Sequence, residues 1–179
     1  KKGDKLVLVF RSRLFSSMKD IMCSYSAQYY DLTKLTRLPF KPMEIGRLCV
    51  DNTASDPFLL LTAFKYLASL ISSGQRDFIF GCTSFSGANN PRHLASLSSL
   101  KKNQLAGQDL SITKKSNTIL DIKKLIGSDK QKMTNSFLPP LLKFYLRLGG
   151  KVSDHAVIDR DLDTLHVFTY LDLNEKKNN

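Results

Sequence analysis

The chain has 179 residues, of which 42% are hydrophobic and 24% charged. This size and balance suit a globular domain that buries a real core, and they exclude a disordered chain. Lysine and arginine total 27 against 16 acidic residues, so the formal charge is +11. That charge favours an anionic partner: nucleic acid, an acidic protein or a membrane face.

The cysteines bear on the cell compartment. Cys23, Cys49 and Cys82 lie far apart, with no pair at metal-ligand or redox spacing. We therefore expect three small buried hydrophobic side chains in a reduced, cytoplasmic setting. No apolar run reaches the roughly 18 residues of a membrane-spanning helix.

The ends of the sequence carry two expectations about its organisation. Because the sequence begins with a lysine, we expect a further N-terminal segment. We expect one domain over residues 1–174, followed by a polar tail at residues 175–179.

The first third of the chain predicts two strands. Residues 5–14 (KLVLVFRSRL) follow a Gly-Asp turn signal and are rich in β-branched and aromatic residues, which favours a strand. Residues 43–51 (MEIGRLCVD) predict a second strand. Strict alternation along it would place Glu44 and Arg47 on opposite faces of a sheet.

The next segment predicts a helix and a strand. Asp56 is a cap residue, Pro57 suits the first helical position, and Gly74 ends the run between them. This helix is apolar on almost all sides, so we expect it to be buried against the sheet. Residues 75–85 (QRDFIFGCTSF) then predict a buried strand.

Two further helices are predicted before a long polar segment ends. Asn90 and Pro91 repeat the cap-and-proline signal and predict a helix that reaches about Leu100. Residues 101–135 are rich in Lys, Ser, Asn and Asp, and they predict a loop with one short amphipathic helix near Ile119–Ile126.

The last part of the chain predicts one helix and two strands. Residues 137–150 (FLPPLLKFYLRLGG) predict a helix whose two prolines fit the first turn and whose two glycines end it. Residues 155–173 predict two strands around the polar turn 159–163, which we expect to be solvated and held by internal ion pairs. Together the predicted elements indicate an α/β domain with a mixed sheet.

Three segments carry a resemblance to a known family. They are residues 44–51 (EIGRLCVD), 78–87 (FIFGCTSFSG) and 138–173, in which a double proline, a helix, glycines and Ile-Asp-Arg-Asp form a long ordered pattern. These segments resemble the ornithine–acyl carrier protein N-acyltransferases, which form lyso-ornithine lipid and are also called hemolysin-like. The resemblance implies a GNAT-like (acyl-CoA N-acyltransferase) mixed sheet. Residues 44–50 and 78–83 would be neighbouring central strands that splay apart at one end.

The resemblance also implies a reaction and its partners. A 3-hydroxy fatty acyl group would move from acyl carrier protein to the α-amine of ornithine. The donor would be the acyl-phosphopantetheine arm of the carrier, and no tightly bound cofactor or metal is implied. The basic charge would then serve acidic acyl carrier protein and an anionic membrane surface instead of nucleic acid. The setting would be cytoplasmic, peripheral on the inner face of the membrane.

Two residues of the second predicted strand are candidates for the acceptor side. Glu44 is a carboxylate in an otherwise apolar strand, and we expect it to be the base that takes a proton from the amine. The alternative is a salt bridge from Glu44 to Arg47 or to a nearby lysine. Arg47 would hold the acceptor carboxylate, because its guanidinium can bind both oxygens. A backbone N–H near Leu48–Val50 would stabilise the oxyanion.

The remaining candidates lie further along the chain. Ser84 would contact the pantetheine amide or the amine, with an ordinary serine in a turn as the alternative. Tyr145 would protonate the departing thiolate, as a tyrosine commonly does in GNAT enzymes. Lys143 and Arg147 share one helix face and would meet the acidic carrier. Apart from this edge, residues 137–150 read as a core helix in preference to a membrane-surface helix.

Two alternative functions remain possible from the sequence. An acyl-homoserine-lactone synthase shares the fold, an acidic-then-arginine strand and the acyl carrier protein donor. A non-enzymatic basic module that binds a membrane surface or nucleic acid is the other alternative.

The segment before the predicted helix (DNTASDPF) lacks the glycines with which general GNAT enzymes wrap coenzyme A, and the negative charge of Asp56 there opposes binding of an anion. This argues against coenzyme A as the donor.

Overall fold

The computed structural model describes residues 4–51, 58–72, 76–89, 91–101, 103–108, 110, 112–125 and 138–173. The predictions for Asp56, Pro57, Gly74, Asn90 and the tail at 175–179 lie outside the described residues. The strands are β1 (Leu8–Leu14), β2 (Tyr30–Asp31), β3 (Pro42–Val50), β4 (Phe78–Ser86), β5 (Thr113–Lys114), β6 (Ile119–Asp121), β7 (Lys151–Asp159) and β8 (Thr164–Asp172). The α-helices are α1 (Ser26–Tyr29), α2 (Leu59–Ser72), α3 (Arg92–Ser99) and α4 (Pro140–Arg147), and the 3-10 helices are η1 (Met18–Cys23) and η2 (Thr33–Arg37).

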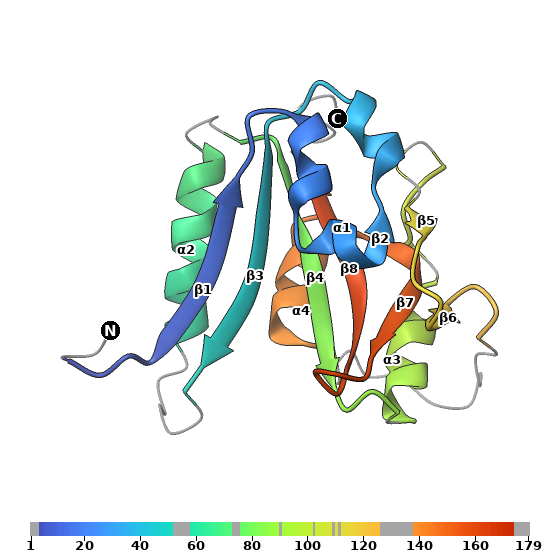
Figure 1. Cartoon of the computed structure of the whole chain (residues 1–179). Coiled ribbons are helices and arrows are strands. Elements are labelled where there is room, and N and C mark those ends of the chain that lie inside the picture. The colour runs from blue at the N-terminus through green and yellow to red at the C-terminus, as the bar shows by residue number, and fades with distance from the viewer. Residues whose placement is uncertain are drawn as a thin grey trace.

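Six strands form one mixed sheet in the order β1-β3-β4-β8-β7-β6 (Figure 1). Every pair is antiparallel except β3 and β4, which run parallel. Their pairing covers only Pro42↔Phe78 to Glu44↔Phe80, after which the two strands part. The predicted GNAT-like α/β sheet, with these two strands as central neighbours that splay at one end, is confirmed.

The splay has a local cause in Gly81 of β4. A Cβ atom at this position would lie 2.0 Å from the backbone oxygen of Ile45. The backbone of β3 at Ile45 therefore occupies the space that the Cβ of any other residue at position 81 would fill. Only glycine allows this close approach of the two backbones at the point where the pairing of β3 with β4 ends.

A β-bulge corrects the predicted alternation along β3. Val9 pairs with Cys49 and Arg11 pairs with Gly46, so two residues of β3, Arg47 and Leu48, oppose one residue of β1. Arg47 takes a positive φ of 55°, which is uncommon outside glycine. The bulge turns the Arg47 side chain, and its guanidinium lies over the ring of Tyr25, 5.4 Å from the ring centre. The strict alternation that would have placed Glu44 and Arg47 on opposite faces is broken here.

The two faces of the sheet carry separate layers. In Figure 1, α2 and α4 lie behind the sheet and the segment from η1 to η2 lies in front. The front layer packs on the aromatic side chains of Phe78, Phe80 and Phe168. The rear layer packs on Met43 and Ile45. The site described below lies at the splayed end, between these layers.

Helix α2 is less buried than its composition predicts. Ala63 and Leu67 are buried against the sheet, and Phe64 stacks on Phe144 with 3.9 Å between ring centres. Leu61 and Tyr66 are 44% and 53% exposed. The expected packing against the sheet is confirmed for the inner face, but the outer face is exposed because, among the described residues, no second layer packs outside this helix. Only its inner face is covered.

The predicted short helix near Ile119–Ile126 is also wrong in its described part. Ile119 to Asp121 form β6, whose residues pair with Val157 to His155 of β7 at the edge of the sheet. The Asp121 carboxylate then accepts a hydrogen bond from the backbone N–H of Lys123, which turns the chain out of the strand. Pairing with β7 determines the conformation of this segment, which is too short for its hydrophobic periodicity to distinguish a helix from a strand.

Helix α4 agrees with its sequence signals. Pro139 precedes the helix and Pro140 occupies its first position. Gly149 has a positive φ of 83°, as expected for a helix end that glycine terminates. Leu141, Leu142 and Tyr145 are buried, so this is the predicted core helix. Among the residues that the structure describes, no helix is long and apolar enough to cross a membrane.

The cysteines correct another expectation. Cys23 and Cys49 are exposed, and Cys82 is half-buried in β4. Cys23 ends η1, where its carbonyl oxygen accepts a hydrogen bond from Arg13, and Cys49 lies beyond the bulge of β3. Sequence composition favours burial of cysteine, but local geometry has placed two of the three at the surface.

Two glycines of neighbouring strands give a test of the splay. We expect Gly81→Ala to lower the free energy of unfolding by about 1–3 kcal/mol or more, because its Cβ would meet a backbone atom that cannot rotate away. Gly46→Ala is the matched control: its Cβ would have no atom within 4 Å, so its effect should stay within about 0.5 kcal/mol. Urea unfolding of both variants measures the difference. Equal losses would contradict this account of Gly81.

Candidate functional site

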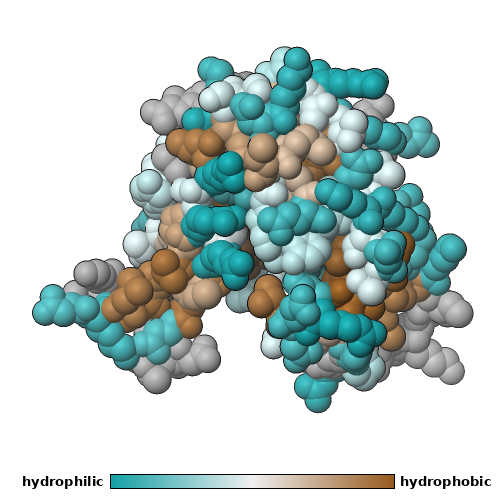
Figure 2. Space-filling view, viewed as in Figure 1, coloured by the Kyte–Doolittle hydropathy of each residue, from teal (hydrophilic) through white to brown (hydrophobic). Residues whose placement is uncertain are grey.

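A pocket of about 450 Å³ opens where β3 and β4 part. In Figure 2 the surface is hollowed at this edge, between the ends of the two strands seen in Figure 1. Its polar lining side chains include Arg11, Tyr25, Glu44, Arg47, Thr83 and Ser84. Its apolar lining side chains include Leu48, Val50, Pro139, Leu141 and Leu162. The pocket thus joins charged groups on β1 and β3 to an apolar wall formed partly by the start of α4.

Glu44 is the most buried charged group of this pocket. Its side chain is 2% exposed and accepts four hydrogen bonds. Oε1 accepts from the backbone N–H and the hydroxyl of Ser26, each at 2.8 Å. Oε2 accepts from the backbone N–H of Tyr25 at 3.2 Å and from Arg11 at 3.1 Å. These donors match the roughly four lone-pair sites of a carboxylate, so all of its acceptor capacity is in use.

Arg11 is a residue of the site that sequence reasoning missed. It lies on β1 directly opposite Gly46, and its guanidinium forms the ion pair with Glu44. The sequence-based alternative of a salt bridge from Glu44 to Arg47 or a lysine did not include it. Arg11 and Arg13 alternate on one face of β1, but only the antiparallel register with β3 brings Arg11 beside Glu44. The sequence of either strand alone does not predict that pairing register.

The structure brings Arg47 and Ser84 into the same pocket as Glu44. Arg47 is exposed and covers the Tyr25 ring, so the pocket has two guanidinium groups near one buried carboxylate. Ser84 is exposed on the opposite wall, on β4. The pocket therefore holds three of the predicted site residues together, on two strands whose pairing ends at Glu44↔Phe80.

Cys82 lies in the wall beside Ser84, with its sulfur 3.5 Å from the Ser26 hydroxyl. Burial raises the pKa of the Cys82 thiol to about 12, and the nearby Glu44 charge adds to this effect. The thiol is therefore protonated at neutral pH. A thiol in this state is a poor nucleophile, so nothing here favours a covalent acyl-cysteine step.

Tyr145 lies behind the pocket and does not line it. Its side chain is 2% exposed within the rear core, and its hydroxyl has no hydrogen-bond partner among the described residues. Burial, and then the charge of Glu44, raises the pKa of this hydroxyl. The proton is thus held firmly. The predicted role of Tyr145 as the acid that protonates the thiolate stays a prediction.

Lys143 and Arg147 line a second hollow, separate from the first. This hollow has a volume of about 530 Å³ and lies between α4 and α3, where Ser99, Leu100 and Gln104 complete it. The structure therefore places the two cations on one face of α4, as predicted, but it does not bring them to Glu44. Their expected contact with the carrier protein is untested by this arrangement.

The turn between β7 and β8 borders the pocket through Leu162, which is 51% exposed. Asp159 is buried and accepts hydrogen bonds from the backbone N–H groups of Asp161 and Leu162 and from the Tyr29 hydroxyl. Asp163 accepts one from the N–H of Ala88. The expectation of internal ion pairs was wrong, because these carboxylates satisfy backbone donors of the tight turn.

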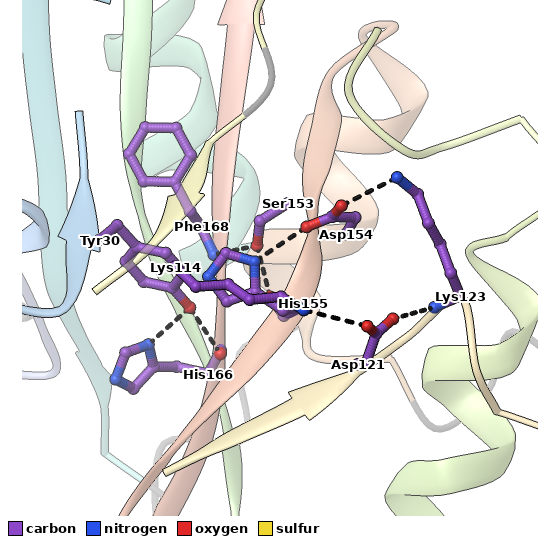
Figure 3. Close-up of polar contacts among 9 residues, drawn as sticks. All are labelled: Tyr30, Lys114, Asp121, Lys123, Ser153, Asp154, His155, His166 and Phe168. Atoms are coloured by element: carbon purple, nitrogen blue, oxygen red, sulfur yellow. Dashed lines mark hydrogen bonds and ion pairs between the residues drawn. The ribbon is translucent and has the colours of Figure 1, made fainter. Parts of the chain in front are cut away.

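A buried polar network lies beside the pocket on the front face of the sheet (Figure 3). The Tyr30 hydroxyl donates to the carbonyl oxygen of His166 at 2.8 Å and lies 3.1 Å from its Nδ1. Nδ1 of His155 lies 2.9 Å from an oxygen of Asp154. Tyr29 packs edge-on against His166, and its ring also contacts Tyr25 of the pocket. The network thus stiffens the wall that carries Tyr25.

His166 is neutral in this network. Its side chain is 1% exposed, and burial lowers its pKa to about 4. The nearby charge of Asp159 acts in the opposite direction but is the smaller effect. A buried, neutral histidine of this kind is a structural residue of the fold.

Comparison with known proteins gives related sequences over most of the chain. The L-ornithine N(alpha)-acyltransferase of Rhodobacter capsulatus is 27% identical over 94% of this chain and 65% of its own length. The proteins of the same name from Brucella abortus and Rhizobium meliloti are 33% and 31% identical over 82% of this chain, and over 53% and 51% of their own lengths. The chain therefore spans between half and two thirds of these relatives. They confirm the resemblance drawn from its motifs.

Two other comparisons give no match. No family model matches the chain. No solved structure matches it either. The relationship therefore rests on the sequences of these relatives, and the fold rests on the structure described above.

The buried histidine gives a pH-dependent prediction. Because the pKa of His166 is about 4 in the folded protein and 6.5 is usual, the unfolded chain binds a proton between these values and the folded chain does not. Stability is therefore fully present above pH 6.5 and is lost as pH falls toward 4, by about 3 kcal/mol at 1.36 kcal/mol per pH unit.

We expect His166→Phe to flatten this part of the stability curve, because Phe cannot take up the proton and Tyr30 keeps the backbone carbonyl as its acceptor. His93→Gln is the control, since His93 is only partly buried and lies on α3, outside the network. Urea unfolding from pH 7 to pH 4 measures both. Parallel curves for His166→Phe and the unaltered protein would contradict the assignment.

Proposed function

We propose that this chain, which is similar in sequence to L-ornithine N(alpha)-acyltransferases, transfers a 3-hydroxy fatty acyl group from acyl carrier protein to the α-amine of ornithine and forms lyso-ornithine lipid. The relatives' name supports ornithine acylation over the acyl-homoserine-lactone alternative. The observation that carries the proposal is the pocket at the splay. It sets a buried carboxylate and two guanidinium groups against an apolar wall.

The first chemical requirement is a neutral amine. An α-ammonium group cannot attack, because its nitrogen has no lone pair until a base removes the proton. Glu44 is the buried carboxylate in the pocket and is the proposed base. The amine nitrogen then attacks the thioester carbonyl carbon, so a C–N bond forms and the C–S bond breaks. The departing pantetheine thiolate takes a proton, for which Tyr145 is the proposed source, and the second proton that the nitrogen loses as the amide forms restores the tyrosine.

The second requirement is stabilisation of the oxyanion that forms during the attack. Beyond Glu44↔Phe80, β3 and β4 no longer pair with each other, and the pocket occupies the space between them. A backbone N–H of Leu48–Val50 on this edge is the proposed donor. The bulge at Arg47 and Leu48 supports this, because bulges leave a residue outside the ladder.

The third requirement is to hold the two substrates together. Arg47 is the proposed partner of the ornithine carboxylate, and Ser84 on the opposite wall is proposed to contact the pantetheine amide or the amine. The apolar side chains of Leu48, Leu141 and Leu162 offer a surface for the start of the acyl chain. Fixing both reactants in one pocket removes much of the entropic cost of their encounter.

The net charge of +11 supports acidic partners. We propose that Lys143 and Arg147, in the hollow between α3 and α4, contact the acidic acyl carrier protein. An anionic membrane face is the proposed destination of the lipid product, in a cytoplasmic and peripheral setting. Both contacts are expected to weaken as salt rises, because the Debye length is about 8 Å at physiological ionic strength.

Acyl transfer by the full-length protein tests the base. We expect Glu44→Gln to lower turnover of ornithine with acyl carrier protein thioester by about 10²–10⁴-fold at neutral pH. The deficit should shrink as pH rises, because more of the amine is then already neutral. Gln also replaces one of the two acceptor oxygens by an NH2 group, which cannot accept the hydrogen bonds made at that position, so the rates are to be corrected for the folded fraction.

Ser26→Ala is the matched control for a purely structural effect. It removes one hydrogen bond from the Glu44 carboxylate but leaves the charge in place. We expect it to lower stability by about 1 kcal/mol and to leave the shape of the pH profile unchanged. A Glu44→Gln enzyme with the turnover of the unaltered protein at neutral pH would show that Glu44 is not the base.

A further inference from the structure

The Glu44 carboxylate accepts hydrogen bonds from four donors, and this occupancy conflicts with work as a base until one donor leaves. Three of the four come from the backbone N–H groups of Tyr25 and Ser26 and from the Ser26 hydroxyl, which is fully buried. They are fixed by the start of α1. The fourth donor is the Arg11 guanidinium, at the end of a long side chain that is 45% exposed. Arg11 is therefore the donor that can move.

The surroundings of Arg11 leave room for an anion. Arg11 lies opposite Gly46, and a Cβ at Gly46 would meet no atom within 4 Å, so the guanidinium borders open space inside the pocket. A guanidinium carries five N–H donors, and the structure shows one of its nitrogens on Glu44. Arg47 follows Gly46 in the chain and lines the same space. Two adjacent strands thus aim two guanidinium groups into one cavity.

We propose that Arg11 binds the α-carboxylate of the amino-acid acceptor together with Arg47, and that this contact draws Arg11 away from Glu44. The inference rests on the proposed function and deepens it. It assigns Arg11 as a substrate-binding residue that selects acceptors with a free carboxylate next to the reacting amine.

The geometry of an α-amino acid makes the exchange useful. The carboxylate and the amine are attached to the same carbon, so a carboxylate held by Arg11 brings the amine next to Oε2 of Glu44. The departure of Arg11 frees a lone pair on that oxygen. The α-ammonium proton passes to this lone pair, and the nitrogen keeps the electron pair with which it attacks. Acceptor binding and activation of the base are then one event.

A comparison of two acceptors isolates the carboxylate. Ornithine and 1,4-diaminobutane share the carbon chain and both amines, and only ornithine has the carboxylate. The full-length protein is expected to bind ornithine more tightly than the diamine by calorimetry without any acyl donor. Arg11→Gln is expected to lower the affinity for ornithine about 10- to 100-fold and to leave that for the diamine nearly unchanged. Arg11→Lys should recover part of the loss, since lysine keeps the positive charge but cannot donate two parallel hydrogen bonds to a carboxylate.

Arg13→Gln is the matched control. Arg13 lies two residues further along β1, but its guanidinium binds the carbonyl oxygen of Cys23 and covers the Phe15 ring, outside the pocket. We expect this variant to keep the preference for ornithine. In steady-state acylation, Arg11→Gln should raise KM for ornithine more than it lowers kcat.

The outcomes separate the inference from the proposed function. A protein that binds ornithine through Arg11 but transfers no acyl group to it would overturn the function and support the binding site. Active protein whose preference for ornithine is the same in Arg11→Gln as in the unaltered chain would overturn the Arg11 assignment and leave the function standing. Equal affinity of the unaltered protein for ornithine and diaminobutane would also overturn the assignment.

Discussion

The buried carboxylate of Glu44 is the interaction on which the site depends. Glu44 lies on β3, and its carboxylate accepts hydrogen bonds from Arg11 of β1 and from Tyr25 and Ser26 at the start of α1. One side chain therefore connects three elements. A buried charge is costly unless it is paired and hydrogen-bonded, and here four donors meet that cost. The same burial that requires these donors also removes water from the place where we propose that a proton is transferred.

Around this carboxylate, two departures from regular strand geometry create the space for a substrate. Gly81 allows the backbone of β3 to approach β4 closely where their pairing ends, and the bulge at Arg47 turns a cation toward Tyr25. Beyond the last shared pair, the strands enclose a pocket instead of a ladder. The front network around Tyr30 and His166 packs against the pocket wall through Tyr29, and the start of rear helix α4 lines the pocket. The fold therefore presents a rigid site at the place where the sheet is interrupted.

Much of this fold was predictable because its signals are local. The prolines and glycines around α4, and the apolar runs of β3 and β4, each determine a conformation within a few residues. The sequence did not predict Arg11, the bulge at Arg47 or strand β6. Each of these depends on pairing between segments distant in the chain. A local sequence pattern does not determine which residues of two strands pair with each other. Glu44 was found because a carboxylate in an apolar strand is unusual, but three of its four hydrogen bonds come from Tyr25 and Ser26, in a segment that the sequence left unassigned.

The central claim is that this pocket acylates the α-amine of an amino acid. Mass spectrometry of lipid extracts tests it most directly, in cells that make no ornithine lipid and express the full-length gene. The account predicts a new lipid with the mass of ornithine joined by an amide to a 3-hydroxy fatty acid, absent when Glu44→Gln is expressed at the same level. Cells that accumulate stable, folded protein and gain no acylated amino acid would contradict it.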